Sequence, residues 1–128
     1  MSKYLKLEGT EDTPEVLFNI ETNEFYLKGR SLPEDSLAFY SPIISWMTEY
    51  VKKPNTSSEL VIALEYFNSS SVKQILNLIS LFEGIVKLNK DAKIIWCYSE
   101  GDDLMEIKGL EFKSMVLNIP FELRSCQI

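Results

Sequence analysis

The 128-residue sequence contains no histidine. This absence excludes mechanisms that need an imidazole base, a histidine-ligated metal or a Ser-His-Asp triad. Only two cysteines occur, Cys97 and Cys126, and with no secretory signal beside them we expect both to be reduced and incidental. With 45% hydrophobic residues, 25% charged residues and only 5 Gly and 5 Pro, the composition is that of a folded chain rather than a disordered one.

Long apolar runs and clusters of basic charge are also missing. No run approaches the ~20 apolar residues that a membrane-spanning helix needs, and residues 1–6 lack the apolar core of a signal peptide. The formal net charge is -6, and the basic residues are scattered rather than gathered in a stripe. We therefore expect a cytoplasmic protein that binds neither membranes nor nucleic acid.

The first third of the chain predicts a β-hairpin followed by a helix. Residues 15–20 and 23–29 have strand character, and the Glu21-Thr22-Asn23 segment between them supplies turn residues. Ser31-Leu32-Pro33-Glu34 has the capping-box pattern, which predicts a helix start. Apolar residues at helical spacing follow to about Lys53, and Pro42 within them predicts a kink or a break.

The remainder alternates between strands and helices. Strands are expected at 60–67, 93–98 and 119–123, and helices from Asn68 to about Asn89 and from Gly101 to about Val116. This order predicts a mixed α/β (α+β) fold in which three to four helices pack on a central sheet of about five strands. At this length, a single domain spanning residues 1–128 is expected.

The Asn68-Ser69-Ser70-Ser71 segment lies between a buried strand and a long amphipathic helix. The first amides of a helix lack intrahelical partners, and the helix dipole places positive partial charge there. A serine or asparagine can simply cap such a helix. A phosphoserine at the same place would bring about -2 charge and three acceptor oxygens. The residues alone leave both interpretations open.

Acidic residues gather at the start of the last predicted helix. Glu100, Asp102, Asp103 and Glu106 could hold a hard cation, but they lack a calcium-loop spacing, and the helix dipole favours acids there anyway. No glycine-rich phosphate loop and no paired nucleophile and base occur. We therefore predict no enzyme activity, no metal and no cofactor.

Three segments resemble the SiaC family of bacterial regulatory phosphoproteins: residues 9–16, residues 29–36 and residues 64–71. The resemblance implies a fold similar to the STAS domains of anti-sigma-factor antagonists, which are also phosphorylated at a helix start after a strand. The family's acceptor is a threonine directly after the asparagine of the last segment, which corresponds to Ser69. Ser70 and Ser71 are the alternative acceptors, and Asn68, Ser70 and Ser71 form the rest of the switch loop.

The resemblance also implies partners. Family members work with a cognate Ser/Thr kinase and a PP2C-type phosphatase, and the unphosphorylated form binds and activates a diguanylate cyclase in c-di-GMP signalling. The loops where the resemblance concentrates suggest a partner surface at Thr13, Pro14, Ser31, Pro33 and Glu34. Two alternatives stay open: an anti-sigma-factor antagonist in a partner-switching module, and a small metal-dependent enzyme built on Asp102 and Asp103.

Overall fold

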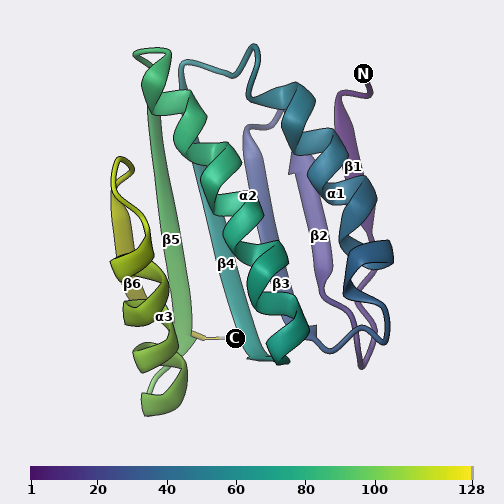
Figure 1. Cartoon of the computed structure of the whole chain (residues 1–128), viewed down its shortest axis with the longest axis vertical. Helices are drawn as coiled ribbons and strands as arrows, with labels where there is room; N and C mark the ends of the chain where they lie inside the picture. The colour runs from purple at the N-terminus through teal and green to yellow at the C-terminus, as the bar shows by residue number, and fades with distance from the viewer. Residues whose placement is uncertain (128) are drawn as a thin grey trace.

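The computed structural model describes residues 1–127, which form six strands and three helices (Figure 1). In chain order these elements are β1 (Tyr4–Leu7), β2 (Glu15–Asn19), β3 (Glu24–Ser31), α1 (Ser36–Tyr50), β4 (Ser57–Phe67), α2 (Ser69–Lys87), β5 (Asp91–Ser99), α3 (Asp103–Met115) and β6 (Phe121–Cys126). No helix among these residues is both long and apolar enough to cross a bilayer.

The six strands form one mixed sheet whose spatial order, β1 to β6, is the order of the chain. β1, β2 and β3 pair antiparallel, while β3, β4, β5 and β6 pair parallel. Each parallel connection contains one helix, and all three helices lie on the same side of the sheet (Figure 1). The predicted fold class is confirmed; the sheet has six strands rather than about five.

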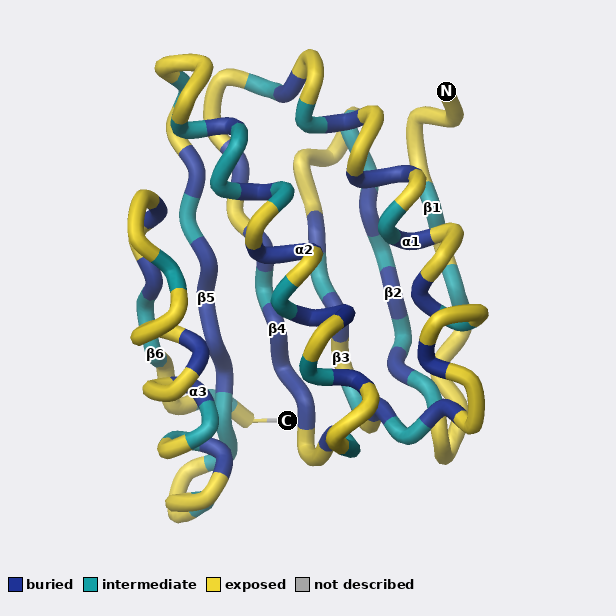
Figure 2. Tube along the Cα trace, in the orientation of Figure 1, coloured by how far each residue is buried: buried dark blue, intermediate teal, exposed yellow. Residues whose placement is uncertain are grey.

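The main hydrophobic core lies between the sheet and the helices. Its largest fully buried side chains include Trp96, Tyr40, Tyr50, Phe18 and Phe25. Because side chains alternate along a strand, buried and less buried positions alternate in Figure 2. A separate and smaller apolar cluster of Ala63, Ile95 and Cys97 belongs to the other face of the central strands.

The predicted hairpin is present as β2 and β3. Asn19 organises the turn, because its Oδ1 accepts hydrogen bonds from the amides of Glu21 and Thr22 at 2.9 and 3.2 Å. Asn23 takes the left-handed conformation at φ 59°, which asparagine tolerates better than most residues. The strand predicted at 60–67 is confirmed and starts three residues earlier, at Ser57.

For the first helix, the predicted cap at Ser31 and a break at Pro42 were both wrong. Ser31 is the last residue of β3, and the N-cap of α1 is Asp35, whose carboxylate accepts from the Ala38 amide at 3.0 Å. Pro42 does not break the helix, which runs continuously from Ser36 to Tyr50. Proline removes the amide that would bond the Ala38 carbonyl, but both residues are exposed, so water can satisfy that oxygen.

The sequence interpretation also missed β1. This strand has four residues of alternating exposure and pairs antiparallel with β2. Its inner residues, Leu5 and Leu7, are only partly buried against the main core. A short, half-exposed edge strand carries too little hydrophobic pattern to be recognised from sequence.

Candidate functional site

The three segments that carry the family resemblance meet at the end of the molecule where α2 begins. Asn68 follows β4 directly, and its amide donates to the Ser31 carbonyl at 3.0 Å. The Leu32 amide donates to the Asp12 carbonyl at 2.7 Å. These backbone bonds join residues that lie 20 to 37 positions apart in the chain. They bring the segment 68–71 beside the loop that leads into α1.

Asn68, rather than a serine, caps α2. Its Oδ1 accepts from the Ser71 amide at 3.1 Å, from the Ser71 hydroxyl at 2.7 Å and from the Ser70 hydroxyl at 3.0 Å. One side chain therefore satisfies a helix amide and also orients two of the three serines. The capping interpretation of this segment is correct for Asn68, which leaves the remaining hydroxyl, on Ser69, outside the cap.

The three serines have different environments. Ser71 is fully buried, and its hydroxyl contacts the Ser31 hydroxyl at 2.8 Å as well as the Asn68 cap. Ser70 is exposed, but its hydroxyl lies 2.6 Å from the Ser36 hydroxyl at the start of α1. Ser69 is the first residue of α2 and is exposed, and its hydroxyl makes no hydrogen bond to any residue in the range 1–127. Ser69 is therefore the most accessible of the three.

A buried hydroxyl network lies beneath this end of α2. The Ser31 hydroxyl contacts the Tyr40 hydroxyl at 2.6 Å and the Ser71 hydroxyl at 2.8 Å, and all three residues are fully buried. Burial raises the pKa of Tyr40 to about 12, so its phenol stays protonated at neutral pH. The network links β3, α1 and α2 and holds the start of α2 firmly in place.

Sequence reasoning missed Tyr40 and Ser36 as parts of this site. In the sequence, Tyr40 is one of the apolar residues at helical spacing, and Ser36 lies directly after the helix cap, Asp35. Tyr40 contacts Ser31, nine residues before it, and Ser36 contacts Ser70, 34 residues after it. Placing these two residues beside Ser31 and Ser70 would have required the correct starting residue of α1.

A groove between α1 and α2 begins near the same helix starts. It has a volume of about 490 Å³, and its lining includes Leu37, Ile44, Lys73 and Asn77. Leu37 is 70% exposed. Lys73 lies one helical turn after Ser69, so the two side chains are neighbours on the surface of α2. The groove thus combines an exposed apolar residue with a cation close to the candidate acceptor.

The five residues expected at a partner surface are not equally accessible. Ser31, Pro14 and Pro33 are buried, Thr13 is half-buried and Glu34 is exposed. The Thr13 hydroxyl lies 2.7 Å from that of Thr10 within its own loop. Glu34 and Thr13 are therefore the members of this set that a partner can touch directly, and the other three shape the loops from beneath.

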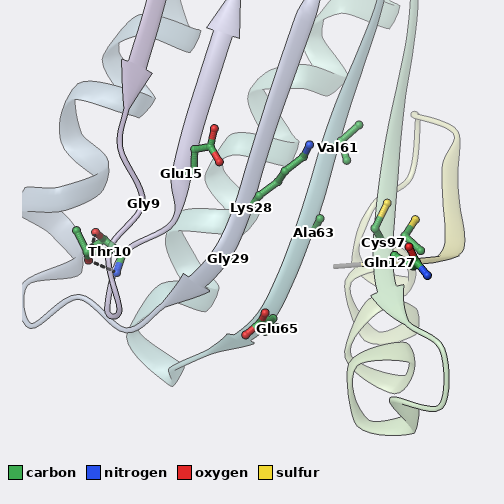
Figure 3. A pocket seen from close by; sticks show the side chains of 12 residues that line it. Gly9, Thr10, Glu15, Lys28, Gly29, Val61, Ala63, Glu65, Cys97 and Gln127 are labelled. Atoms are coloured by element: carbon green, nitrogen blue, oxygen red, sulfur yellow. Dashed lines mark hydrogen bonds between the residues drawn. The ribbon is translucent and has the colours of Figure 1, made fainter.

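A second concave site, which the sequence did not suggest, lies on the face of the sheet opposite the helices (Figure 3). It has a volume of about 540 Å³ and is lined by Glu15, Lys28 and Glu65 together with Cys97 and Cys126. The Tyr26 hydroxyl donates to Glu15 at 3.0 Å, and the Lys28 ammonium lies 4.1 Å from the centre of the Tyr26 ring.

The Cys97 thiol of this second site is poorly suited to nucleophilic chemistry. Cys97 and Cys126 are both free cysteines. Burial, reinforced by the neighbouring Cys126 thiol, raises the pKa of Cys97 to about 12. Because the thiolate is the reactive form, Cys97 is unreactive at neutral pH.

The acidic cluster at the start of α3 has a structural role. Asp102 caps the helix by accepting from the Met105 amide at 3.1 Å, and Glu106 accepts from the Tyr98 hydroxyl at 3.2 Å. Within residues 1–127, no group of three or more acidic or cysteine side chains is arranged to hold a metal ion. The geometry therefore gives the metal-dependent interpretation no support.

Both a family model and a relative match almost the whole chain. The model of the SiaC family of regulatory phosphoproteins matches residues 7–126. An uncharacterized protein of Pseudomonas aeruginosa is 23% identical over 121 residues, which cover 94% of this chain and 95% of that protein.

Solved structures resemble the chain over almost its full length. SiaC of Pseudomonas aeruginosa is 24% identical, with a TM-score of 0.85 over 98% of this chain and 100% of that chain. A chain in the crystal structure of the diguanylate cyclase SiaD in complex with its activator SiaC, from the same organism, is 23% identical, with a TM-score of 0.87 over 95% of this chain and 99% of that one.

Proposed function

Because the chain belongs to the SiaC family of regulatory phosphoproteins, we propose that it is a non-catalytic switch protein controlled by phosphorylation of Ser69. In its unphosphorylated form it binds and activates a diguanylate cyclase. A cognate Ser/Thr kinase ends this interaction, and a PP2C-type phosphatase restores it. The observation that carries the proposal is the position of Ser69, exposed and without a hydrogen-bond partner in residues 1–127, at the first residue of a capped 19-residue helix.

The physical mechanism is a local change of charge. A phosphate on Ser69 would lie at the positive end of the α2 dipole, one turn from Lys73, so both favour the added charge. The cap on Ser71 and the buried network do not involve Ser69, so the fold persists. The phosphate instead adds about -2 charge to the surface beside Leu37 and the α1–α2 groove. A partner that fits the neutral surface is then repelled.

The neighbouring serines are weaker candidates for physical reasons. Phosphorylation of Ser71 would require its fully buried hydroxyl to leave the network with Ser31. Phosphorylation of Ser70 would break the 2.6 Å contact with Ser36. Of these three serines, only Ser69 can accept a phosphate without losing a hydrogen bond that its hydroxyl makes within residues 1–127.

The choice of a diguanylate cyclase as output partner is supported by one structural relative. The cyclase SiaD of Pseudomonas aeruginosa has been crystallised with its activator SiaC, and a chain of that complex matches 95% of this protein. Such a partner could contact the accessible surface at the start of α2, where a phosphate on Ser69 would change the charge. A sigma-factor regulator as partner is the competing outcome of the experiments below.

The acceptor is tested by incubating the purified protein with its cognate kinase and ATP. Intact-mass analysis of the wild type should show one added phosphate, and fragmentation should locate it on Ser69. Ser69→Ala should take up none, whereas the matched Ser70→Ala variant should be modified like the wild type. Phosphate uptake by Ser69→Ala at the wild-type rate would falsify the assignment.

The output is tested by adding the protein to the purified cyclase and measuring c-di-GMP formation. Unphosphorylated wild type and Ser69→Ala should both stimulate the enzyme, and the kinase should abolish stimulation by the wild type alone. If neither form binds the cyclase while the unphosphorylated form binds an anti-sigma kinase, the antagonist function replaces the one proposed.

A further inference from the structure

Two cysteines meet on the face of the sheet that carries no helix. Cys97 lies in β5 and is 6% exposed, whereas Cys126 is the last residue of β6 and is partly exposed. Both are free thiols, and both line the concave site that also contains Lys28. Figure 3 shows Cys97 and Gln127, the residue after Cys126, at the same wall of that site. The two thiols thus share one surface and come from strands that are neighbours in the sheet.

The pairing of β5 with β6 places the two cysteine side chains on the same face. Cys97 pairs with Arg124, and Cys126 follows two residues later on the same strand. Side chains two positions apart on a strand point the same way, so Cys126 is a diagonal neighbour of Cys97. Cys126 packs against the small buried cluster that contains Cys97, and its hydrogen bond contributes to the raised pKa of Cys97. The two sulfurs are therefore adjacent.

The end of β6 can adapt to a bond between these sulfurs. Diagonal neighbours on a sheet have Cα atoms about 7–8 Å apart, slightly beyond the separation that a relaxed disulfide spans. Because Cys126 ends β6, only the last pair of the β5–β6 ladder, Ser99 with Cys126, needs to shift. A disulfide that forms away from its relaxed geometry is readily reduced, which favours a reversible site over a permanent crosslink.

We propose that Cys97 and Cys126 form a reversible oxidation site, in which a peroxide converts the two thiols into a disulfide between β5 and β6. The bond closes the chain from residue 97 to residue 126, a stretch that includes α3. It therefore makes the stability of this part of the domain depend on redox conditions. This inference does not rest on the proposed function, because neither cysteine belongs to the segment 68–71 or to the α1–α2 groove.

The first oxidation step takes place on Cys126. Cys97 is buried and protonated at neutral pH, so a peroxide in solution does not oxidise it directly. Cys126 is partly exposed, and its sulfur attacks one oxygen of the peroxide. The O–O bond breaks, Cys126 becomes a sulfenic acid, and the other oxygen leaves with the thiol proton as water.

Cys97 then acts on the sulfenic acid. Its sulfur attacks the Cys126 sulfur, the S–S bond forms, the S–O bond breaks, and the hydroxyl leaves with the Cys97 proton as a second water. Oxidation of Cys126 removes the thiol that helped to raise the pKa of Cys97, while Arg124 and Lys28 still favour the thiolate. Contact between the two groups supplies the effective concentration that Cys97 lacks toward reagents in solution. In sum, the two thiols lose two protons and two electrons, and hydrogen peroxide is reduced to two waters.

The site is tested by treating the folded protein with hydrogen peroxide and removing the peroxide with catalase. Urea with iodoacetamide then unfolds the protein and blocks any remaining thiols before the intact mass is measured. The wild type should lose the mass of two hydrogen atoms and take up no alkyl group, and dithiothreitol should reverse the change. A non-reducing tryptic digest should contain one species that joins residues 94–108 to residues 125–128. The oxidised protein should melt at least about 3 °C higher than the reduced one.

Two matched variants test the order of the steps. Cys126→Ser should be almost unaffected by the same peroxide treatment, because the buried Cys97 thiol is left without an accessible partner. Cys97→Ala keeps a small apolar side chain beside Ala63 and Ile95, and it should accumulate sulfinic acid at Cys126 because no thiol intercepts the sulfenic acid. Circular dichroism verifies that both variants are folded.

Three outcomes would overturn the proposal. The first is a wild type that keeps both thiols, or that forms sulfinic acid at Cys126 without the disulfide. The second is a disulfide that appears only between two copies of the chain. The third is an intramolecular disulfide that lowers the melting temperature, because the bond would then form at the expense of the pairing between β5 and β6.

Discussion

At the scale of single residues, buried hydroxyl groups beneath the start of α2 hold the candidate switch segment, residues 68–71, against β3 and α1. The Tyr40 hydroxyl lies 2.6 Å from that of Ser31, and both residues are fully buried. Tyr40→Phe removes this bond while keeping the ring, so we expect the free energy of unfolding to fall by about 1 kcal/mol. Urea denaturation measures the change. Tyr4→Phe is the matched control, because Tyr4 is 59% exposed, and an equal loss there would contradict the role assigned to the network.

Tyr40 also predicts a dependence of stability on alkaline pH. Its pKa is about 12 in the folded protein because burial disfavours the phenolate, against 10 for an ordinary tyrosine. Below pH 10 the phenol is protonated in both states and contributes no pH dependence. Between pH 10 and 12 the unfolded chain releases this proton and the folded chain retains it, so stability falls as pH rises.

Urea denaturation from about pH 9 to 12 should therefore show a steeper decline for the wild type than for Tyr40→Phe. The buried Cys97 thiol, whose pKa is also raised to about 12, remains in both proteins and contributes equally to their curves. Parallel curves for the two proteins would mean that Tyr40 reaches solvent in the folded state.

At the scale of elements, the close packing of α3 on the sheet depends on Gly109. A Cβ atom at this position would approach the Trp96 Nε1 atom to 2.6 Å, and Trp96 is fully buried and donates to the Met105 carbonyl at 3.0 Å. Gly109→Ala should therefore lower the free energy of unfolding by about 1–3 kcal/mol, despite the better helix propensity of alanine.

Gly84 in α2 is the matched control, because a Cβ atom there would meet no atom within 4 Å. Gly84→Ala should raise the free energy of unfolding by about 0.5–1 kcal/mol. Thermal or urea unfolding of both variants measures the two effects. Opposite signs are the decisive result; a gain in stability from Gly109→Ala would show that α3 does not pack as closely as described.

Elements with strong periodicity could be predicted from sequence, and weakly patterned ones could not. The buried strand β4 and the amphipathic helix α2 were expected within about three residues of their bounds. The start of α1 was misplaced because Ser31 and Glu34 have the spacing of a capping box. The residue that caps the helix is Asp35, four positions after Ser31. Ser31 is instead a buried strand residue whose polarity is satisfied by Tyr40 and Ser71. No local pattern indicates a partner 40 residues away.

The site was predictable to the same degree. The local residue pattern alone places Asn68 and the three serines at the start of a helix, and the structure has them there. It could not rank the serines, because accessibility depends on Ser31 and Ser36, which lie in β3 and α1. The choice of Ser69 came from family resemblance, and the hydrogen bonds of its neighbours now provide an independent physical reason for it.

At the scale of the whole molecule, placing all helices on one face of the sheet separates three surfaces (Figure 1). The start of α2 carries the candidate switch, α3 carries a group of exposed apolar side chains, and the opposite face of the sheet carries the cavity around Lys28. A phosphate added at the first surface need not disturb the other two. Under the proposed function, this division would let the chain change one contact without losing its fold.

The antiparallel edge formed by β1 should contribute to the stability of the entire domain. β1 covers β2, its Leu5 and Leu7 side chains pack on the core, and the Ser2 carbonyl before it accepts from the Trp46 indole at 3.0 Å. Removing residues 1–7 would expose the β2 edge and uncover Trp46, which is 8% exposed. We expect the free energy of unfolding to fall by at least about 2 kcal/mol, from lost apolar burial and lost strand pairing.

Two point variants distinguish packing from a general effect of shortening the chain. Leu7→Ala should reproduce a substantial part of the loss, whereas Lys6→Ala, whose side chain points to the exposed side of the same strand, should change stability by less than about 0.5 kcal/mol. Urea denaturation should remain a single transition for the truncated protein, with a smaller m-value because less surface is exposed on unfolding. An unchanged midpoint after truncation would mean that the sheet is stable from β2 onward and that β1 only guards its edge.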